Sequence, residues 1–436
     1  MKFGHTFQEA LAKERYPQHW VEKAIPYRQL KKILGKVREE LHKNGYDPDT
    51  LRQLLADHKA EYHLEPDDAH LLHPKLIVRS GVRTLPAPEN AKEEVKEGES
   101  VSEAIPPAVD SLNSSSSEHP QASRSLQQVD EDGWIKIPMD ADERFFNLLS
   151  SDVNELDVLQ TQEQQSMTLK IHDLGAEISQ VAKPRKGLVN LSKSDLYRWR
   201  EIFEIYLAAE VFFSTSEQHG GLRNSEKARQ QLIWFQEEVN KRQLPQRFKI
   251  ESSAIAYMHF LNLNATLLQN LQFQELNQTA VTKIIKKFDK RTSLGVKQVF
   301  PKLMYTAHFI SESVSKDICA QLSREVINLV PQVVDYSCTI CMSICWIPVR
   351  LDCDHVFCIR CMIKMQNQNK RFCPLCRADV IQRANENHID DEMVRFLERW
   401  FPKETKEKQA WNELERRKEL LGEALVREDA PPCIVM

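Results

Sequence analysis

The apolar positions near the start of the chain follow the three- and four-residue spacing of an amphipathic helix. They are Leu30, Ile33, Leu34, Val37 and Leu41. Pro26 precedes them, and a proline suits an early helix position because its φ is fixed and it has no N–H to leave unpaired. We therefore predict that the first segment, 1–78, is helical.

A longer apolar stripe with the same spacing lies in the middle of the chain. Its members are Leu149, Val153, Leu156, Met167, Ile171, Leu174, Ile178 and Val181. A coiled-coil seam has this spacing, and a helical hairpin within one chain has it as well; we favour the hairpin. The pattern ends at Pro184 and Gly187. Further helices are predicted over 196–213, 254–271 and 279–290, so the fold is expected to be mainly α.

Residues 83–133 have a different character from the segments on either side. They are acidic, rich in serine and proline, and nearly free of aromatic residues. Such a segment cannot bury enough apolar surface to offset the entropy that is lost on ordering. We predict that it is disordered and that order resumes near Trp134.

Composition narrows the class of protein. The chain has 436 residues, enough for two or three domains, and 41% of them are hydrophobic. Its formal net charge of -4 argues against a globally basic nucleic-acid binder. No apolar leader opens the chain, and no stretch approaches the ~20 apolar residues that a membrane-spanning helix needs. We expect a cytoplasmic protein that folds in a reducing compartment.

The cysteines are concentrated in one part of the chain. Of the 10 cysteines, eight lie within 338–376, and Cys319 and Cys433 lie outside that stretch. In a reducing compartment such a cluster indicates metal ligation rather than disulfides.

Most of these cysteines, together with one histidine, have the spacing of a double zinc site. The ligands run Cys338-x2-Cys341, Cys353-x-His355-x2-Cys358-x2-Cys361 and Cys373-x2-Cys376. Zinc takes four tetrahedral sulfur or nitrogen ligands, so this set would bind two zinc ions. Cys345 is left over, either as a buried thiol or as a competing ligand. We favour the thiol, because the other ligands already fill both sites.

The order of the ligands resembles that of RING fingers. The resemblance implies interleaved sites, with Cys338, Cys341, Cys358 and Cys361 on one ion and Cys353, His355, Cys373 and Cys376 on the other. It also implies that the module positions a ubiquitin-loaded conjugating enzyme. Ile340 and Pro374 match the apolar contacts to that enzyme, and Arg377 matches the cation that bridges it to ubiquitin. Met365 departs from the family, which often has tryptophan there, and a structural zinc module without ligase activity is the alternative.

A second candidate site lies on a basic helix. Four lysines fall on one helical face: Lys283, Lys286, Lys287 and Lys290. The opposite face is apolar, with Val281, Ile284, Ile285 and Phe288. Like charges at this spacing destabilise a helix by roughly a few tenths of a kcal/mol per pair, and an anionic partner would relieve the repulsion. A solvated helix face would show the same pattern. Nucleic acid is a weaker choice of partner, because no stacking aromatics accompany the lysines.

Segments at both ends of the region 1–303 resemble SPX domains. They are MKFGHTF at 1–7, QHWVEKAIPYRQLKKIL at 18–34 and LNQTAVTKIIKKFDKRT at 276–292. The resemblance implies a helical bundle that binds inositol polyphosphates and inositol pyrophosphate. Tyr27, Lys31 and Lys287 would form its phosphate-binding cluster. The surrounding basic surface would comprise Lys2, Lys283, Lys286 and Lys290, with His5 where many members have lysine.

An SPX domain followed by a RING resembles the plant nitrogen-limitation-adaptation ubiquitin ligases and their fungal counterparts. That family acts on phosphate transporters and related phosphate-handling proteins. The expected partners are therefore a conjugating enzyme, ubiquitin, such substrates and inositol polyphosphates. A phosphate-sensing scaffold without ligase activity is the second hypothesis. A homodimer is a further expectation, because RINGs often act as dimers.

The domain boundaries follow from these segments. We predict an SPX domain at 1–315, with the disordered insertion 83–133 and a helical expansion at 184–245. A linker helix follows at 316–335, and then a small RING with a short β-hairpin and a helix at 336–380. A C-terminal helix is predicted at 381–425. Its apolar strip, expected to pack on the RING, comprises Met393, Val394, Phe396, Leu397, Trp400 and Phe401.

The last four residues form a candidate lipidation signal. Cys433-Ile434-Val435-Met436 fits the C-a-a-X pattern, and methionine in the last place favours farnesylation of Cys433. The tail 426–436 is expected to be flexible and accessible. A single lipid binds membranes only marginally, so a membrane-protein substrate would have to supply the second anchor. An unmodified C-terminus is the alternative.

Overall fold

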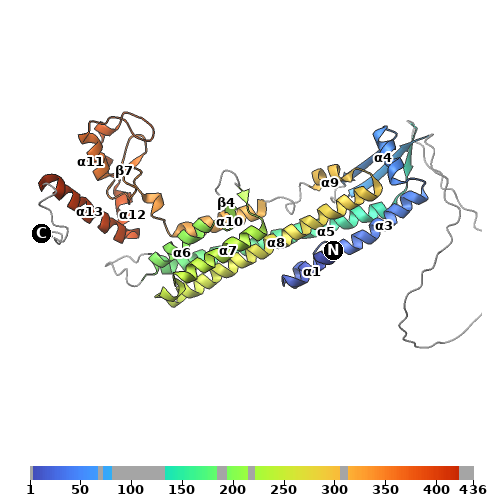
Figure 1. Ribbon diagram of the computed structural model, residues 1–436, viewed down its shortest axis with the longest axis horizontal. Coiled ribbons are helices and arrows are strands. Elements are labelled where there is room, and N and C mark those ends of the chain that lie inside the picture. The colour runs from blue at the N-terminus through green and yellow to red at the C-terminus, as the bar shows by residue number, and fades with distance from the viewer. Residues whose placement is uncertain are drawn as a thin grey trace, which may run out of the picture. The chain divides into compact units, whose positions relative to one another are not determined.

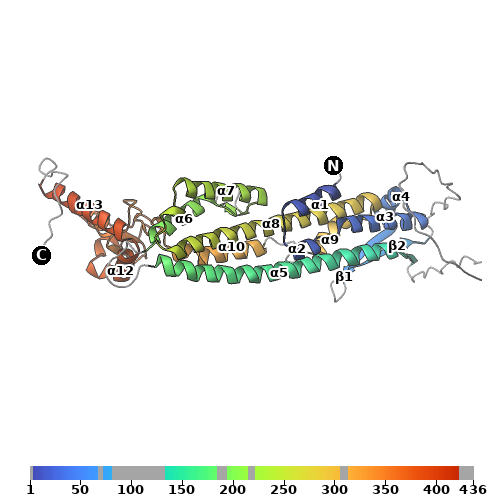
Figure 2. The same cartoon turned by 90° about the horizontal axis from the view of Figure 1, so that it is seen from below.

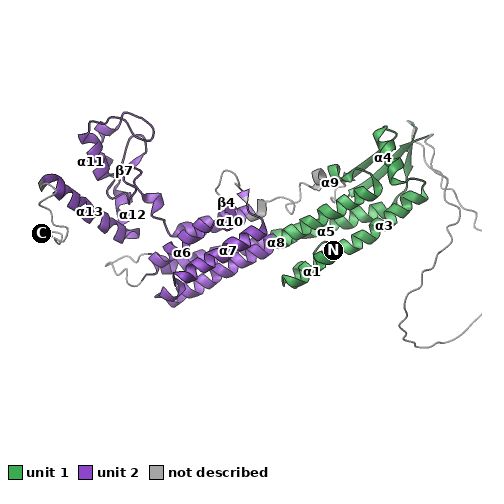
Figure 3. Ribbon diagram, viewed as in Figure 1, with its two compact units in different colours: residues 1–162, 272–313 green, residues 163–271, 314–436 purple. Residues whose placement is uncertain are grey.

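The computed structural model describes residues 3–66, 72–80, 133–183, 194–214, 221–304 and 313–421. Helices dominate it, and two of them are long: α5 (Asp140–Ala182) and α8 (Glu251–Thr292) (Figure 1). The chain divides into two compact units (Figure 3). The first comprises Met1–Gln162 and Gln272–Ser313, and the second comprises Glu163–Leu271 and Val314–Met436. The prediction of a mainly α fold is confirmed.

The first unit begins with four helices. They are α1 (Phe3–Lys13), α2 (Gln18–Glu22), α3 (Tyr27–Lys43) and α4 (Pro48–Ala56). Within this unit α3 lies beside α5 and α8 (Figures 1 and 2). Leu30 and Leu34 of α3 share a core with Phe145 of α5 and Phe288 of α8, and all four are fully buried. The apolar spacing therefore identified both the helix α3 and its buried face.

The prediction of helix up to residue 78 is wrong after α4. The strands β1 (Ala60–Pro66) and β2 (Leu72–Arg79) form an antiparallel pair, and β3 (Trp134–Ile137) adds to β2. Leu76 and Val78, two residues apart, are both buried, which is the period of a strand rather than a helix. The third strand comes from far along the chain, so a local pattern could not reveal it. The predicted disordered insertion falls on residues that lie, as far as 132, outside the described part of the chain, and the description begins again at Gly133.

The second unit contains a bundle of helices. Its members are parts of α5 and α8, together with α6 (Leu196–Ala209), α7 (Ser225–Lys241) and α10 (Ser313–Glu325). A two-residue hairpin pair, β4 (Phe213–Ser214) and β5 (Gly221–Leu222), precedes α7. The part of the apolar stripe of α5 from Met167 onward lies in this core, with Met167, Ile171 and Ile178 fully buried. Its earlier members, Leu149, Val153 and Leu156, lie in the core of the first unit. The stripe is therefore buried within the chain.

The helix α8 is continuous where two separate helices were predicted. The region between them contains Gln274 and Asn277, which interrupt the apolar pattern but are buried. The Asn277 amide donates to the carbonyl of Phe273 at 2.9 Å, and its Oδ1 accepts from the backbone N–H of Ile25 at 2.9 Å. Because this polar side chain finds partners inside the core, the helix does not need to end there.

The cysteine-rich module and two helices complete the second unit. The module contains β6 (Pro348–Arg350), β7 (Val356–Cys358) and α11 (Ile359–Asn367). The single C-terminal helix predicted after it is in fact two, α12 (Asp391–Trp400) and α13 (Pro402–Leu421). The break falls at Phe401, because a residue before proline is excluded from the helical region by a clash with the proline ring.

None of the helices in the described ranges is both long enough and apolar enough to cross a lipid bilayer.

Candidate functional site

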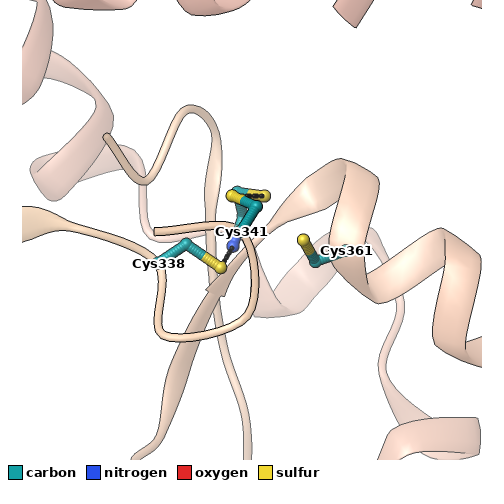
Figure 4. A group of neighbouring side chains, drawn as sticks. Cys338, Cys341 and Cys361 are labelled. Atoms are coloured by element: carbon teal, nitrogen blue, oxygen red, sulfur yellow. Dashed lines mark hydrogen bonds between the residues drawn. The ribbon is translucent and has the colours of Figure 1, made fainter. Parts of the chain in front are cut away.

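The predicted zinc ligands gather in two groups of four. One group is Cys338, Cys341, Cys358 and Cys361, and the other is Cys353, His355, Cys373 and Cys376. Within each group the ligand atoms lie within 4.8 Å of one another. The sulfurs of Cys338, Cys341 and Cys361 turn toward one another, and the Sγ atoms of Cys341 and Cys358 are 3.8 Å apart (Figure 4). These groups are the interleaved pairs that the resemblance to RING fingers implied.

Two similar loops shape the two groups. The N–H of Met342 donates to the carbonyl of Cys338 at 2.8 Å, and the N–H of Arg377 donates to the carbonyl of Cys373 at 2.8 Å. Met342 and Arg377 each follow the second cysteine of a C-x2-C pair, and both have a positive φ. The loops therefore close in the same way, and each brings its two sulfurs to one side. The helix α11 begins directly after Cys358 and carries Cys361 in its first turn.

The donor set fits zinc. His355 Nδ1 is buried and has no hydrogen-bond partner among the described residues, and it belongs to the group with Cys353, Cys373 and Cys376. A bound ion would satisfy that nitrogen. Four-sulfur and three-sulfur, one-nitrogen sets are those of structural zinc sites, in which no position is left open for a substrate.

Cys345 is the cysteine of the module that belongs to neither group of four. It is buried, and each group already has the four ligands that a zinc ion takes. The structure therefore favours the buried thiol among the two predicted roles of Cys345.

The basic face of α8 also has the predicted form. Lys283, Lys286 and Lys290 are exposed and Lys287 is half-buried, whereas the apolar residues of the opposite face are buried. Lys2 lies outside the described residues. The segment that holds these lysines is the last part of α8 and belongs to the first unit.

Aromatic residues link α1, α3 and α8 beside these lysines. The ring of Phe3 contacts the ring of Tyr27 edge to face, with centroids 4.9 Å apart. Lys283 Nζ lies 5.1 Å from the centroid of the same Phe3 ring. Burial raises the pKa of Tyr27, and the positive charge of Arg291 opposes that shift. Sequence analysis did not include Arg291, although it follows Lys290 directly. Lys31 is exposed, one turn after Tyr27 on α3.

Family comparisons agree with this arrangement. Residues 1–304 match the model of the SPX domain, and residues 338–376 match the model of the C3HC4 zinc finger, the RING finger. The chain belongs to the SPX-domain family and carries a RING finger.

Two fungal proteins resemble this SPX–RING protein over nearly their whole length. It is 34% identical to "Transcriptional regulator of yeast form adherence 3" of Candida albicans, over 100% of both chains. It is 33% identical to an uncharacterized RING finger protein of Schizosaccharomyces pombe, over 95% of this chain and 96% of the relative. A shorter match, 31% identical over 27% of this chain and 21% of the relative, is to the E3 ubiquitin-protein ligase rnf8-B of Xenopus laevis. No solved structure matches the chain.

The RING residues that were predicted to face a conjugating enzyme are at the surface. Ile340 is 41% exposed, and Pro374 and Arg377 are exposed as well. Met365 is different, because only 6% of its surface is accessible and it packs in the core of the RING. Sequence reasoning missed further exposed apolar side chains of the module, among them Ile363 and Leu375. Their spacing to the zinc ligands carried the signal, since each lies two residues after a ligand.

Proposed function

We propose that this SPX–RING protein is a RING-type ubiquitin ligase. The observation that carries the proposal is the pair of complete four-ligand groups beside the exposed Ile340, Pro374 and Arg377. A ligase of this type forms no covalent intermediate with ubiquitin. It binds a ubiquitin-loaded conjugating enzyme and holds the thioester in a reactive geometry. Zinc would supply only structural cross-links between the loops.

The three exposed residues have distinct proposed roles. Ile340 and Pro374 offer apolar contacts on the two knuckle loops, where the backbone is fixed by the ligands on either side. Arg377 presents a planar guanidinium, which can donate to two partners at once and would bridge the conjugating enzyme and ubiquitin. Support for these roles comes from their exposure and from the similar closure of the two loops.

We further propose that the SPX domain regulates the ligase by binding inositol pyrophosphate. Tyr27, Lys31 and Lys287 would contact the phosphates, with Lys2, Lys283, Lys286 and Lys290 around them. The support is a dense ammonium face on α8, close to the aromatic pair Phe3 and Tyr27. The substrates would be phosphate transporters or other proteins of phosphate homeostasis, brought to the ligase according to phosphate supply.

The deciding experiment is autoubiquitination of the purified full chain with a panel of conjugating enzymes, with and without inositol pyrophosphate. Ubiquitin chains whose yield changes with the ligand would support both proposals. A yield of ubiquitin chains that does not change with the ligand would support the ligase proposal and contradict the proposal that the ligand regulates the RING. No chains with any enzyme of the panel would contradict the ligase proposal.

A second candidate function is a phosphate-sensing scaffold whose RING only binds proteins. The burial of Met365 favours it, because an apolar surface side chain at that place is then missing from the conjugating-enzyme contact. Discharge of a ubiquitin-loaded conjugating enzyme onto free lysine separates the two functions. A scaffold leaves the discharge rate unchanged, whereas a ligase accelerates it.

We propose that the protein is cytoplasmic and that a fraction of its molecules is held at membranes by a farnesyl group on Cys433. This residue lies outside the described residues. Intact mass spectrometry of the protein from its native host tests this proposal. The expected mass includes a farnesyl group and lacks the last three residues. An unmodified terminus would contradict it.

A further inference from the structure

Lys408, on α13, is a buried cation. Only 7% of its surface is accessible, and no carboxylate of the described residues lies within ion-pair distance of it. Its ammonium donates to Ser343 Oγ at 3.0 Å and to Cys341 Sγ at 3.6 Å. It also lies 4.0 Å from the centroid of the Trp411 ring.

Burial of an ammonium is costly unless an anion or strong acceptors accompany it. A hydroxyl and an aromatic face supply part of what Lys408 needs. Cys341 supplies the rest when it is a zinc thiolate, because four thiolates outweigh the positive charge of one Zn²⁺ and make the four-cysteine site an anion. Ser343 strengthens the connection, since its hydroxyl donates to Cys341 Sγ at 3.3 Å.

We propose that Lys408 is the outer cation of the four-cysteine zinc site, so that α13 is part of that metal centre. Lys408 does not bind the ion; it neutralises the ligand set and orients Cys341 through Ser343. Partners of this kind around a metal site commonly change metal affinity by roughly 10- to 100-fold. The other group of four contains His355 and has no corresponding lysine contact among the described residues.

α13 has further anchors along its length. Arg360 of α11 donates to the carbonyl of Asn412 at 3.2 Å and pairs with Glu419 at 2.6 Å. Near the start of α13, Glu404 pairs with the buried Arg200 of α6 at 3.2 Å. α13 thus connects the zinc site to the helical bundle of the same unit. Because coupling between two events is reciprocal, occupation of the four-cysteine site stabilises the docked position of α13 as much as α13 stabilises the ion.

Lys408→Met in the full chain tests the proposal, since methionine keeps most of the volume and removes the charge. Lys406→Met is the matched control, because Lys406 is exposed on the same helix. Lys408→Arg keeps the positive charge and should therefore retain much of the metal affinity that Lys408→Met loses. The probe is Co²⁺ followed by competition with a chelator, because Co²⁺ with four sulfur ligands absorbs differently from Co²⁺ with three sulfurs and one nitrogen.

The expected result is a fall of roughly 10-fold or more in the affinity of the four-sulfur site in Lys408→Met, with the three-sulfur, one-nitrogen site unchanged. Equal loss at both sites would indicate general unfolding of the RING and overturn the proposal. So would a four-sulfur affinity equal to that of Lys406→Met. Metal affinity is measured without ubiquitin transfer. The result can therefore be interpreted even if the ligase proposal fails.

Discussion

Arg377 and Ile340 sit at surface positions that the zinc ligands hold in place. Arg377 has a φ of 63°, on the loop that closes over Cys373, and Ile340 lies between Cys338 and Cys341. Neither side chain contributes a ligand or fills the core. Their removal should therefore affect binding of a partner and leave the RING folded.

We predict that Ile340→Ala or Arg377→Ala abolishes ubiquitin transfer while zinc content stays near that of the unmodified protein. Transfer is measured by discharge of a loaded conjugating enzyme, and zinc by elemental analysis. Val334→Ala and Arg383→Ala are the matched controls, since both residues are exposed outside the proposed contact. Normal transfer by both Ile340→Ala and Arg377→Ala would refute the assigned roles.

Asp142 is a buried carboxyl in the first turn of α5. Its Oδ2 accepts from the hydroxyl of Tyr62 at 2.8 Å, and its Oδ1 has no hydrogen-bond partner among the described residues. Burial raises the pKa of Asp142 from 3.8 to about 7, and the nearby Glu40 adds to the shift. Between these two values the folded state holds a proton that the unfolded chain has released. Stability from this group therefore falls as the pH rises through that window.

We predict that Asp142→Asn removes this part of the pH dependence of unfolding. The variant should gain stability relative to the unmodified protein as the pH rises from about 4 to about 7. Thermal unfolding across this range measures the difference. Asp140→Asn, an exposed change in the same turn, should leave the pH profile as it is. Parallel profiles for Asp142→Asn and the unmodified protein would contradict the prediction.

At the scale of elements, the proposed phosphate site depends on three helices. α1 supplies Phe3, α3 supplies Tyr27 and Lys31, and α8 supplies the lysine face with Lys287. The buried side of α8 fixes the direction of that face, because Ile284 and Phe288 lie in the core of the first unit. The lysines can then contact an anion without rearrangement of the helix.

We predict that Lys31→Ala or Lys287→Ala lowers the affinity for inositol pyrophosphate strongly, because each removes an ammonium from a multiply charged site. Calorimetry on the full chain measures the affinity. Lys227→Ala, on α7 of the second unit, is the control and should bind normally. Unchanged binding in both test variants would contradict the assignment of the site.

At the scale of the whole molecule, the RING and the helical bundles differ in what holds them together. The RING core is small and includes the ligand cysteines themselves. The bundles have large apolar cores, with Phe145, Phe203 and Phe260 fully buried. A small module whose core contains its metal ligands is expected to lose its structure with the metal.

We predict that removal of zinc by a chelator unfolds the RING and leaves most of the helical signal in place. Circular dichroism should change little, while hydrogen exchange rises across 338–381. Addition of zinc should restore slow exchange and ubiquitin transfer. Loss of most of the helical signal on chelation would show that the bundles depend on the zinc sites, contrary to this prediction.

The sequence by itself determined the zinc ligands and the main helices. Ligand identity depends on residue type and short spacing, and both are visible along the chain at Cys338 to Cys376. The buried faces of α3 and α5 follow from a period of 3.6, which is a local property of the helix. For the same reason the lysine face of α8 and the apolar face opposite it could both be predicted.

Only the tertiary structure decided the features that depend on distant partners. The sheet of β1, β2 and β3 needs a strand from Trp134–Ile137, and α8 is continuous because Asn277 finds a partner in Ile25. The contact between Lys408 and Cys341 could not be predicted from the sequence either. A lysine in a highly charged helix is expected to be solvent-exposed unless the residues packed around it are known. Burial and pairing across long separations are set by packing, and a linear pattern of residues does not contain them.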